Sequence, residues 1–182
     1  MNSSLLLWVL AFVGVAWAVG AYNRLVRLRT EVNAAFAAVD AELQPLVRLV
    51  DDMLAGIDPR DEDRTPPSDK FLAPIRDASG QLFNALATAR LRPLDGERIE
   101  AVRSAGEHWA RVWNQAEYED ARELGGPYLP DTVSTERALR LKQAEVIAAQ
   151  FNESIDRYNR AVTQIPAVLI AWTFNLRRGR RL

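Results

Sequence analysis

The chain has 182 residues, which is enough for one soluble domain and one further segment. It contains no cysteine, and this excludes disulfide bonds, thiolate metal sites and a cysteine nucleophile. Seven of the 23 Lys and Arg residues lie in two short clusters, so residues 30–176 carry 16 basic residues against all 24 acidic ones. An acidic body of this kind argues against a nucleic acid as the partner.

The first element is an apolar segment, residues 5–22, in which no side chain is charged. Its 18 residues make about 27 Å of helix, close to the thickness of the hydrocarbon core of a bilayer. No turn residue follows it, so we predict a transmembrane anchor over residues 1–23 that continues into the first helix of a soluble domain. A cleaved signal peptide is the alternative, because Ala16-Trp17-Ala18 resembles a small-x-small cleavage site, but the usual basic region before such a signal is missing.

The arginines next to the anchor predict its orientation. Arg24, Arg27 and Arg29 follow the apolar segment, and no Lys or Arg precedes it. The positive-inside rule then places the N-terminus outside and the bulk of the chain in the cytoplasm.

Four amphipathic helices are predicted, because apolar residues recur at every third or fourth position. The first continues the anchor and ends near Gly56. Residues 58–69 contain three prolines and a dense run of mixed charge, which predicts a solvated loop. The other three helices are expected over about residues 68–91, 95–125 and 131–166, with Asp95 as the N-cap of the third.

These helices predict an all-α fold in which the transmembrane helix continues into an antiparallel four-helix bundle over residues 24–166. In that topology the last helix returns toward the membrane. The tail, residues 167–182, combines aromatic rings and arginines, which favour an anionic membrane surface. The predicted membrane-surface contacts are Arg24, Arg27, Arg29, Trp172, Phe174, Arg177, Arg178, Arg180 and Arg181.

The residues that usually carry catalysis or bind metals are scarce. His108 is the single histidine, and no Glu-x-x-His motif, nucleophile elbow or phosphate-binding glycine loop occurs. Trp109 and Trp113 are four residues apart and are predicted to lie in the core. We therefore expect no enzymatic activity, no cofactor and no metal.

Asn23, Asn152 and Asn159 each follow an aromatic residue. Asn152 and Asn159 are seven residues apart and so share one face of a helix, beside the apolar stripe that contains Tyr158. One interpretation is a polar network between helices, formed by Asn23, Asn152, Tyr158 and Asn159, that fixes their register. The other is a polar groove that receives a partner helix.

Two stretches, residues 5–54 and 139–176, resemble the bacterial LemA family. The shared features are an aromatic-Asn pair after the membrane helix, two such pairs seven apart in the last helix, and two dipeptides that follow: Tyr22-Asn23, Phe151-Asn152, Tyr158-Asn159, Ile165-Pro166 and Ile170-Ala171. Phe151 replaces the family's tyrosine, and Pro45-Leu46 and Asp51-Asp52 replace its Arg-Arg and Pro-Asn, as in a divergent member. The resemblance implies a single-pass protein of the bacterial inner membrane with a helical cytoplasmic bundle. It implies no particular biochemical activity.

The sequence thus predicts a membrane-anchored helical interaction or scaffold protein, with the lipid bilayer and a protein as its partners. A periplasmic helical binding protein, released by cleavage of a signal peptide, is the alternative. Neither interpretation names the partner protein or the oligomeric state.

Overall fold

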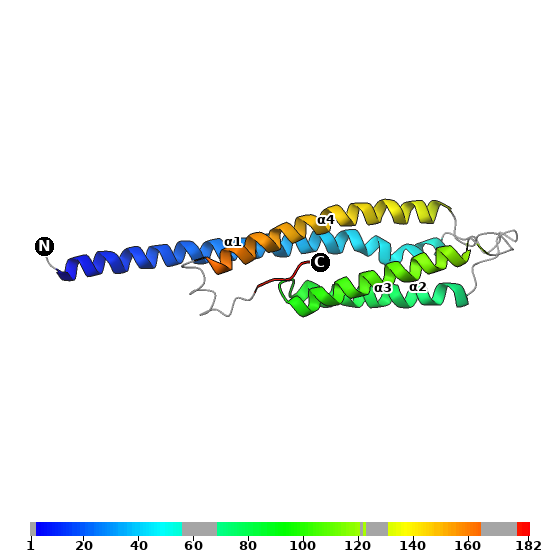
Figure 1. Ribbon diagram of the computed structural model, residues 1–182, viewed down its shortest axis with the longest axis horizontal. Coiled ribbons are helices and arrows are strands. Elements are labelled where there is room, and N and C mark those ends of the chain that lie inside the picture. Colours follow the sequence, from blue (N-terminus) through cyan, green and yellow to red (C-terminus); the bar gives the residue numbers. More distant parts are fainter. Residues whose placement is uncertain (1–2, 56–68, 121, 123–130, 165–177) are drawn as a thin grey trace.

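Helix α1 is the longest element of the computed structural model and runs without a break from Ser3 to Ala55 (Figure 1). The structure describes residues 3–55, 69–120, 122, 131–164 and 178–182. Near the start of α1 large apolar side chains are exposed, such as Trp8 (77%) and Phe12 (75%), and this part is apolar enough to cross a membrane. From Leu25 onward, one apolar stripe of the same helix is buried. The predicted continuation of the apolar helix into the bundle is confirmed.

Three further helices complete the fold: α2 (Asp69–Leu91), α3 (Gly96–Asp120) and α4 (Asp131–Thr163). The regular structure of the described residues is entirely helical, and the predicted all-α bundle is confirmed. The end of α1 next to Gly56 and the end of α2 at Leu91 agree with the sequence pattern. The predicted loop at 58–69, apart from the first residue of α2, and the predicted end of the third helix near residue 125 lie outside the described residues.

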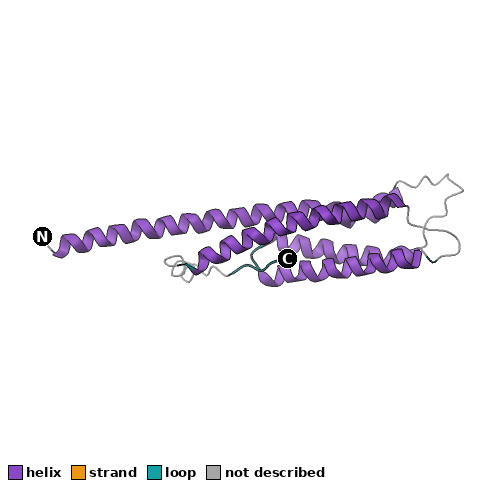
Figure 2. Ribbon diagram, turned by 45° about the horizontal axis from the view of Figure 1, so that its top comes forward, coloured by secondary structure: helices purple, strands orange, loops and turns teal. Residues whose placement is uncertain are grey.

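Helices α1 and α4 pack side by side as an antiparallel pair (Figures 1 and 2). The rings of Phe36 and Phe151 meet edge to face, with their centroids 5.7 Å apart. Near the apolar segment, the Arg24 guanidinium donates to the side-chain oxygen of Gln164 at 3.2 Å. The end of α4 therefore lies beside the point where α1 leaves its apolar segment, as an up-down bundle requires.

Helices α2 and α3 form a hairpin. Of its two helices, α2 packs against α1. Inside the hairpin, the indole N–H of Trp109 donates to the hydroxyl of Ser79 at 3.0 Å, and both side chains are buried. Trp109 and Trp113 are core residues, as predicted. Between the hairpin and α1, Arg90 forms an ion pair with Asp40 at 2.7 Å.

Over the residue ranges given above, the backbones of α3 and α4 do not come into contact with each other. Among the described residues, no Cα atom of α3 lies within 8 Å of a Cα atom of α4. Far from the anchor, side chains bridge this gap, because the buried Arg137 of α4 donates to Glu117 of α3 at 3.1 Å and lies over the ring of Trp113. At the end nearer the anchor, a separate segment of the chain lies between the two helices.

Replacing Phe151 with Ala tests how much the α1–α4 contact contributes to stability. Phe151 is completely buried, so the substitution should lower the free energy of unfolding by about 3–5 kcal/mol. Leu139→Ala is the matched control, because Leu139 lies on the same helix but is 66% exposed; its loss should stay near about 0.5 kcal/mol. Denaturant unfolding of the full chain in mild detergent, followed by tryptophan fluorescence, measures both. Equal losses would contradict the packing described above.

Candidate functional site

Two asparagines of α4 hold residues 178–182 by their backbone. Asn159 donates from Nδ2 to the carbonyl oxygen of Gly179 at 2.9 Å, and its Oδ1 accepts from the Gly179 N–H at 2.8 Å. Asn152 makes the same two contacts with Leu182, at 3.3 and 2.9 Å. A side-chain amide carries donors and an acceptor, so each asparagine satisfies both backbone groups of one residue. We call Asn152 and Asn159 the asparagine clamp, and residues 178–182 the C-terminal segment.

The spacing of the clamp matches the spacing of the residues that it holds. Positions seven apart on an α-helix are separated by about 10.5 Å along the helix axis. Residues three apart in an extended chain are separated by about 10 Å. Asn152 and Asn159 can therefore grip Leu182 and Gly179 at the same time, with the C-terminal segment antiparallel to α4.

The backbone at Gly179 lies close to side chains of the bundle. A Cβ atom at this position would lie 2.7 Å from Cδ1 of Ile155 and 3.0 Å from Cδ2 of Leu94. Ile155 is fully buried, so its side chain has little room to retreat. A larger residue at position 179 would force these side chains to shift, so glycine suits the close approach of the backbone.

Two arginines of the C-terminal segment pair with carboxylates on different helices. Arg181 donates to Asp156 of α4 at 2.9 Å, and Arg180 lies 3.3 Å from Glu100 of α3. The hydrogen bond from Arg181 lowers the pKa of Asp156. The pKa of Glu100 is lowered mainly by its hydrogen bond with Arg103, with a smaller contribution from the charge of Arg180.

The C-terminal segment thus occupies the side of the bundle where α3 and α4 do not meet. Its charged side chains reach both helices, and Leu182 packs against the hydrophobic core. The segment acts as a short additional element that links α4 with the start of α3.

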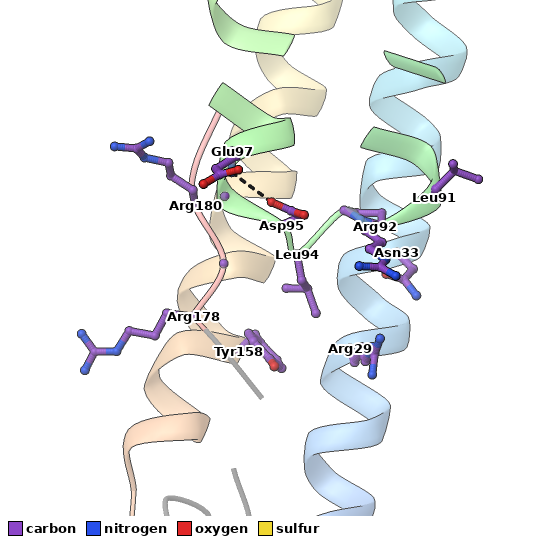
Figure 3. Close-up of a pocket in the computed structure, with 13 residues that line it drawn as sticks. Arg29, Asn33, Leu91, Arg92, Leu94, Asp95, Glu97, Tyr158, Arg178 and Arg180 are labelled. Atoms are coloured by element: carbon purple, nitrogen blue, oxygen red, sulfur yellow. Dashed lines mark hydrogen bonds between the residues drawn. The ribbon is translucent and has the colours of Figure 1, made fainter. Parts of the chain in front are cut away.

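A cleft of about 1050 Å³ opens beside the asparagine clamp (Figure 3). Its walls come from α1, the turn between α2 and α3, α4 and the C-terminal segment. Figure 1 shows this turn at the end of the hairpin nearer to the apolar part of α1, so the cleft lies on the anchor side of the hairpin. The polar residues that line it are Arg29, Asn33, Arg92, Asp95, Glu97, Tyr158, Arg178 and Arg180.

Both carboxylate oxygens of Asp95 accept hydrogen bonds at the start of α3. One carboxylate oxygen accepts from the backbone N–H of Glu97 at 3.1 Å, which confirms the predicted N-cap. The other accepts from the guanidinium of Arg98 at 3.3 Å.

Tyr158 forms part of the wall between the core and the cleft. The residue is almost completely buried, and this burial raises the pKa of its hydroxyl, while the positive charge of Arg29 acts in the opposite direction. The hydroxyl therefore stays protonated and available as a donor at neutral pH.

The polar network predicted from the sequence is realised only in part. Asn152 and Asn159 share one face of α4, as their spacing predicts, but they bind the C-terminal segment instead of another helix. Tyr158 lines the cleft and is not part of the clamp. Asn23 is exposed and makes no hydrogen bond among the described residues, because it lies two positions before the buried Leu25 and so on a different face of α1.

The arginines of α1 lie near its apolar segment. Arg24 and Arg27 are exposed, and Arg27 pairs with Glu31 at 3.7 Å. Arg29, two residues further along, lines the cleft. The contact of these three residues with lipid stays a prediction.

Two arginines of the C-terminal segment contact the bundle, and the predicted contact of this segment with the membrane stays a prediction. Arg180 and Arg181 pair with carboxylates of the bundle, because the segment runs back along α4 from Asn159 to Asn152, away from the anchor. Arg178 lies at the edge of the cleft. The remaining predicted contacts, Trp172, Phe174 and Arg177, lie outside the described residues.

No protein-family model, curated protein or solved structure matches this chain. Within the described part of the chain, no group of three or more Asp, Glu or His side chains is arranged to hold a metal ion. The asparagine clamp and the cleft beside it are therefore the candidate functional site on geometry alone.

An engineered disulfide between positions 96 and 180 tests the docking of the C-terminal segment. A Cβ atom at Gly96 would lie 3.5 Å from the Cβ of Arg180, within the range of a disulfide, and the chain has no cysteine of its own. We expect the variant with Gly96→Cys and Arg180→Cys to form an intramolecular disulfide under mild oxidation. Mass spectrometry of the intact, alkylated chain detects it.

Gly106→Cys combined with Arg180→Cys is the matched control. A Cβ atom at Gly106 meets nothing within 4 Å, and this position lies ten residues further along α3. Adding Asn152→Ala and Asn159→Ala to the first pair should slow its crosslinking several-fold, because four hydrogen bonds are lost. Equal crosslinking of the two cysteine pairs would show that the segment is not docked.

The ion pair of Asp156 predicts that docking weakens in acid. Since the docked state lowers the pKa of this carboxyl below its ordinary value of 3.8, its stabilising effect is complete above that value. The effect is lost as the pH falls through the lowered pKa. Protection of the Gly179 and Leu182 amides against hydrogen exchange should be constant from pH 7 to about 4 and should decrease below it.

Asp156→Asn separates this ion pair from general acid unfolding. The variant should show weaker amide protection at pH 7 and a smaller further loss in acid than the original chain. Amides of α3 report on the whole bundle in the same experiment. An identical acid profile for both chains would exclude the role of Asp156.

Proposed function

We propose that this chain is a single-pass, membrane-anchored helical protein that serves as a scaffold or interaction partner at the membrane surface. The observation that carries the proposal is α1, in which the exposed apolar segment and the first core helix of the bundle are one helix. Such an element holds the bundle at a fixed distance from the bilayer. No catalytic step is part of the proposal.

The proposed site of action is the cytoplasmic face of a bacterial inner membrane. Arg24, Arg27 and Arg29 support this orientation, because positive charge next to a membrane span favours the cytoplasmic side. Their position beside the end of α4 puts positive charge on the face of the bundle that would be nearest the lipid.

The resemblance to the LemA family supports the same proposal. The aromatic-Asn pairs that carry the resemblance include Asn152 and Asn159, which form the clamp. We propose that the chain is a divergent member, with a protein partner in addition to the bilayer.

A periplasmic helical binding protein, released by signal cleavage, is the second candidate. The observation that favours it is Ala16-Trp17-Ala18, which resembles a cleavage site. The two candidates predict different masses for the mature chain.

Membrane fractionation and fusion reporters test the proposed anchor. The full chain should sediment with membranes, resist carbonate extraction and keep its complete mass. A C-terminal alkaline phosphatase fusion should be inactive and a C-terminal fluorescent-protein fusion should fluoresce. A soluble chain that lacks about the first 18 residues would favour the periplasmic candidate instead.

A further inference from the structure

The cleft is lined by more positive charges than the nearby carboxylates neutralise. Arg29 of α1, Arg92 of the α2–α3 turn and Arg178 of the C-terminal segment line it, and none of the three pairs with a carboxylate among the described residues. Most arginines elsewhere on the bundle are paired, as Arg90, Arg103, Arg137, Arg157 and Arg181 illustrate. Of the two acids in the lining, Asp95 already caps α3 and binds Arg98.

Neutral donors accompany these arginines. Tyr158 is 1% exposed, and within the described part of the chain its hydroxyl has no hydrogen-bond partner. Figure 3 shows the Tyr158 side chain directed into the space between α4 and α1, below Leu94. Arg92 and the amide of Asn33 lie close together on the opposite side of that space. A tyrosine hydroxyl that opens into a cleft also lined by Arg29 and Arg92 is suited to an anion that accepts several hydrogen bonds.

The height of the cleft above the membrane favours the same kind of ligand. Arg29 lies seven residues beyond Tyr22, the last residue of the apolar segment, and this corresponds to about 10 Å along α1. The polar headgroups of a bilayer extend about 5–8 Å beyond its hydrocarbon core. The long side chain of Arg29 can span the difference.

We propose that this cleft binds a phosphate group, carried by the headgroup of an anionic phospholipid or by a soluble phosphate compound. Arg29 and Arg92 donate charge-assisted hydrogen bonds to the phosphate oxygens, and guanidinium groups match this geometry. The Tyr158 hydroxyl donates a further bond from the α4 side of the cleft. The lipid source depends on the proposed membrane anchor, whereas a soluble phosphate does not.

Ligand titrations of the full chain in a neutral detergent test the proposal. The probes are dihexanoyl phosphatidylglycerol, dihexanoyl phosphatidylcholine and sodium phosphate, each followed by the rise in Tm with ligand concentration. We expect phosphatidylglycerol or phosphate to raise Tm in a saturable way. Arg92→Gln and Tyr158→Phe should each weaken the apparent affinity, by about tenfold for the arginine.

Arg111→Gln is the matched control, because Arg111 is exposed on α3 and lines a different surface groove. It removes the same charge as Arg92→Gln and should leave the affinity unchanged. Tyr158→Phe keeps the buried ring and removes only the hydroxyl, so it distinguishes a loss of binding from a loss of folding.

The outcomes separate the two ligand sources from failure of the proposal. A response to phosphatidylglycerol alone identifies a lipid headgroup site, and an equal response to inorganic phosphate identifies a site for soluble phosphates. A response that Arg111→Gln reduces as much as Arg92→Gln would reflect general surface charge and would overturn the proposal, as would the absence of any saturable response. Membrane fractionation is scored independently, so failure of the anchor and failure of the cleft are distinguishable.

Discussion

The buried stripe of α1 is the contact on which the rest of the body depends. α1 packs against α4 on one side and against the α2–α3 hairpin on the other, while the backbones of α3 and α4 stay apart among the described residues. The two antiparallel pairs are therefore joined mainly through α1. Close packing at positions such as Phe36, which meets Phe151, leaves little tolerance for movement of α4 relative to α1.

In that arrangement α3 and α4 are connected by side chains and by the C-terminal segment instead of by direct helix packing. Arg137 bridges the far end of the gap, and the C-terminal segment fills the end nearer the anchor. Because the asparagine clamp binds backbone groups, it fixes the path of the segment without depending on most of its side chains. Gly179 is the exception, since its lack of a side chain sets how closely the segment can approach Ile155. The same segment provides one wall of the cleft, so the clamp and the cleft form one structural unit.

The fold followed from the sequence because each of its signals is local. Spacing of apolar residues every three or four positions located the helices, and Asp95 marked the start of α3. The common face of Asn152 and Asn159 followed from helical geometry alone. The groups that they bind did not, because a side-chain amide pairs equally well with a helix, another amide or an extended backbone.

Charge was similarly ambiguous in the sequence. The arginines of residues 177–181 indicated an anionic surface, and in the structure Arg180 and Arg181 pair with Glu100 and Asp156 of the bundle. Those carboxylates lie on different helices, so only the packing of α3 and α4 brings them to one segment. The cleft has no sequence motif at all, because its walls come from four separate parts of the chain.

Because α1 is continuous, the number of residues in it sets both the distance of the bundle from the membrane and the rotation of the bundle about the helix axis. A helix advances about 1.5 Å and turns about 100° with each residue. One residue added between the apolar segment and Leu25 would thus lift the body only slightly, but it would swing the mouth of the cleft through more than a quarter of a circle about the axis of α1. The number of residues between these two points therefore determines which way the cleft faces, with no loop or hinge in α1 to correct the angle.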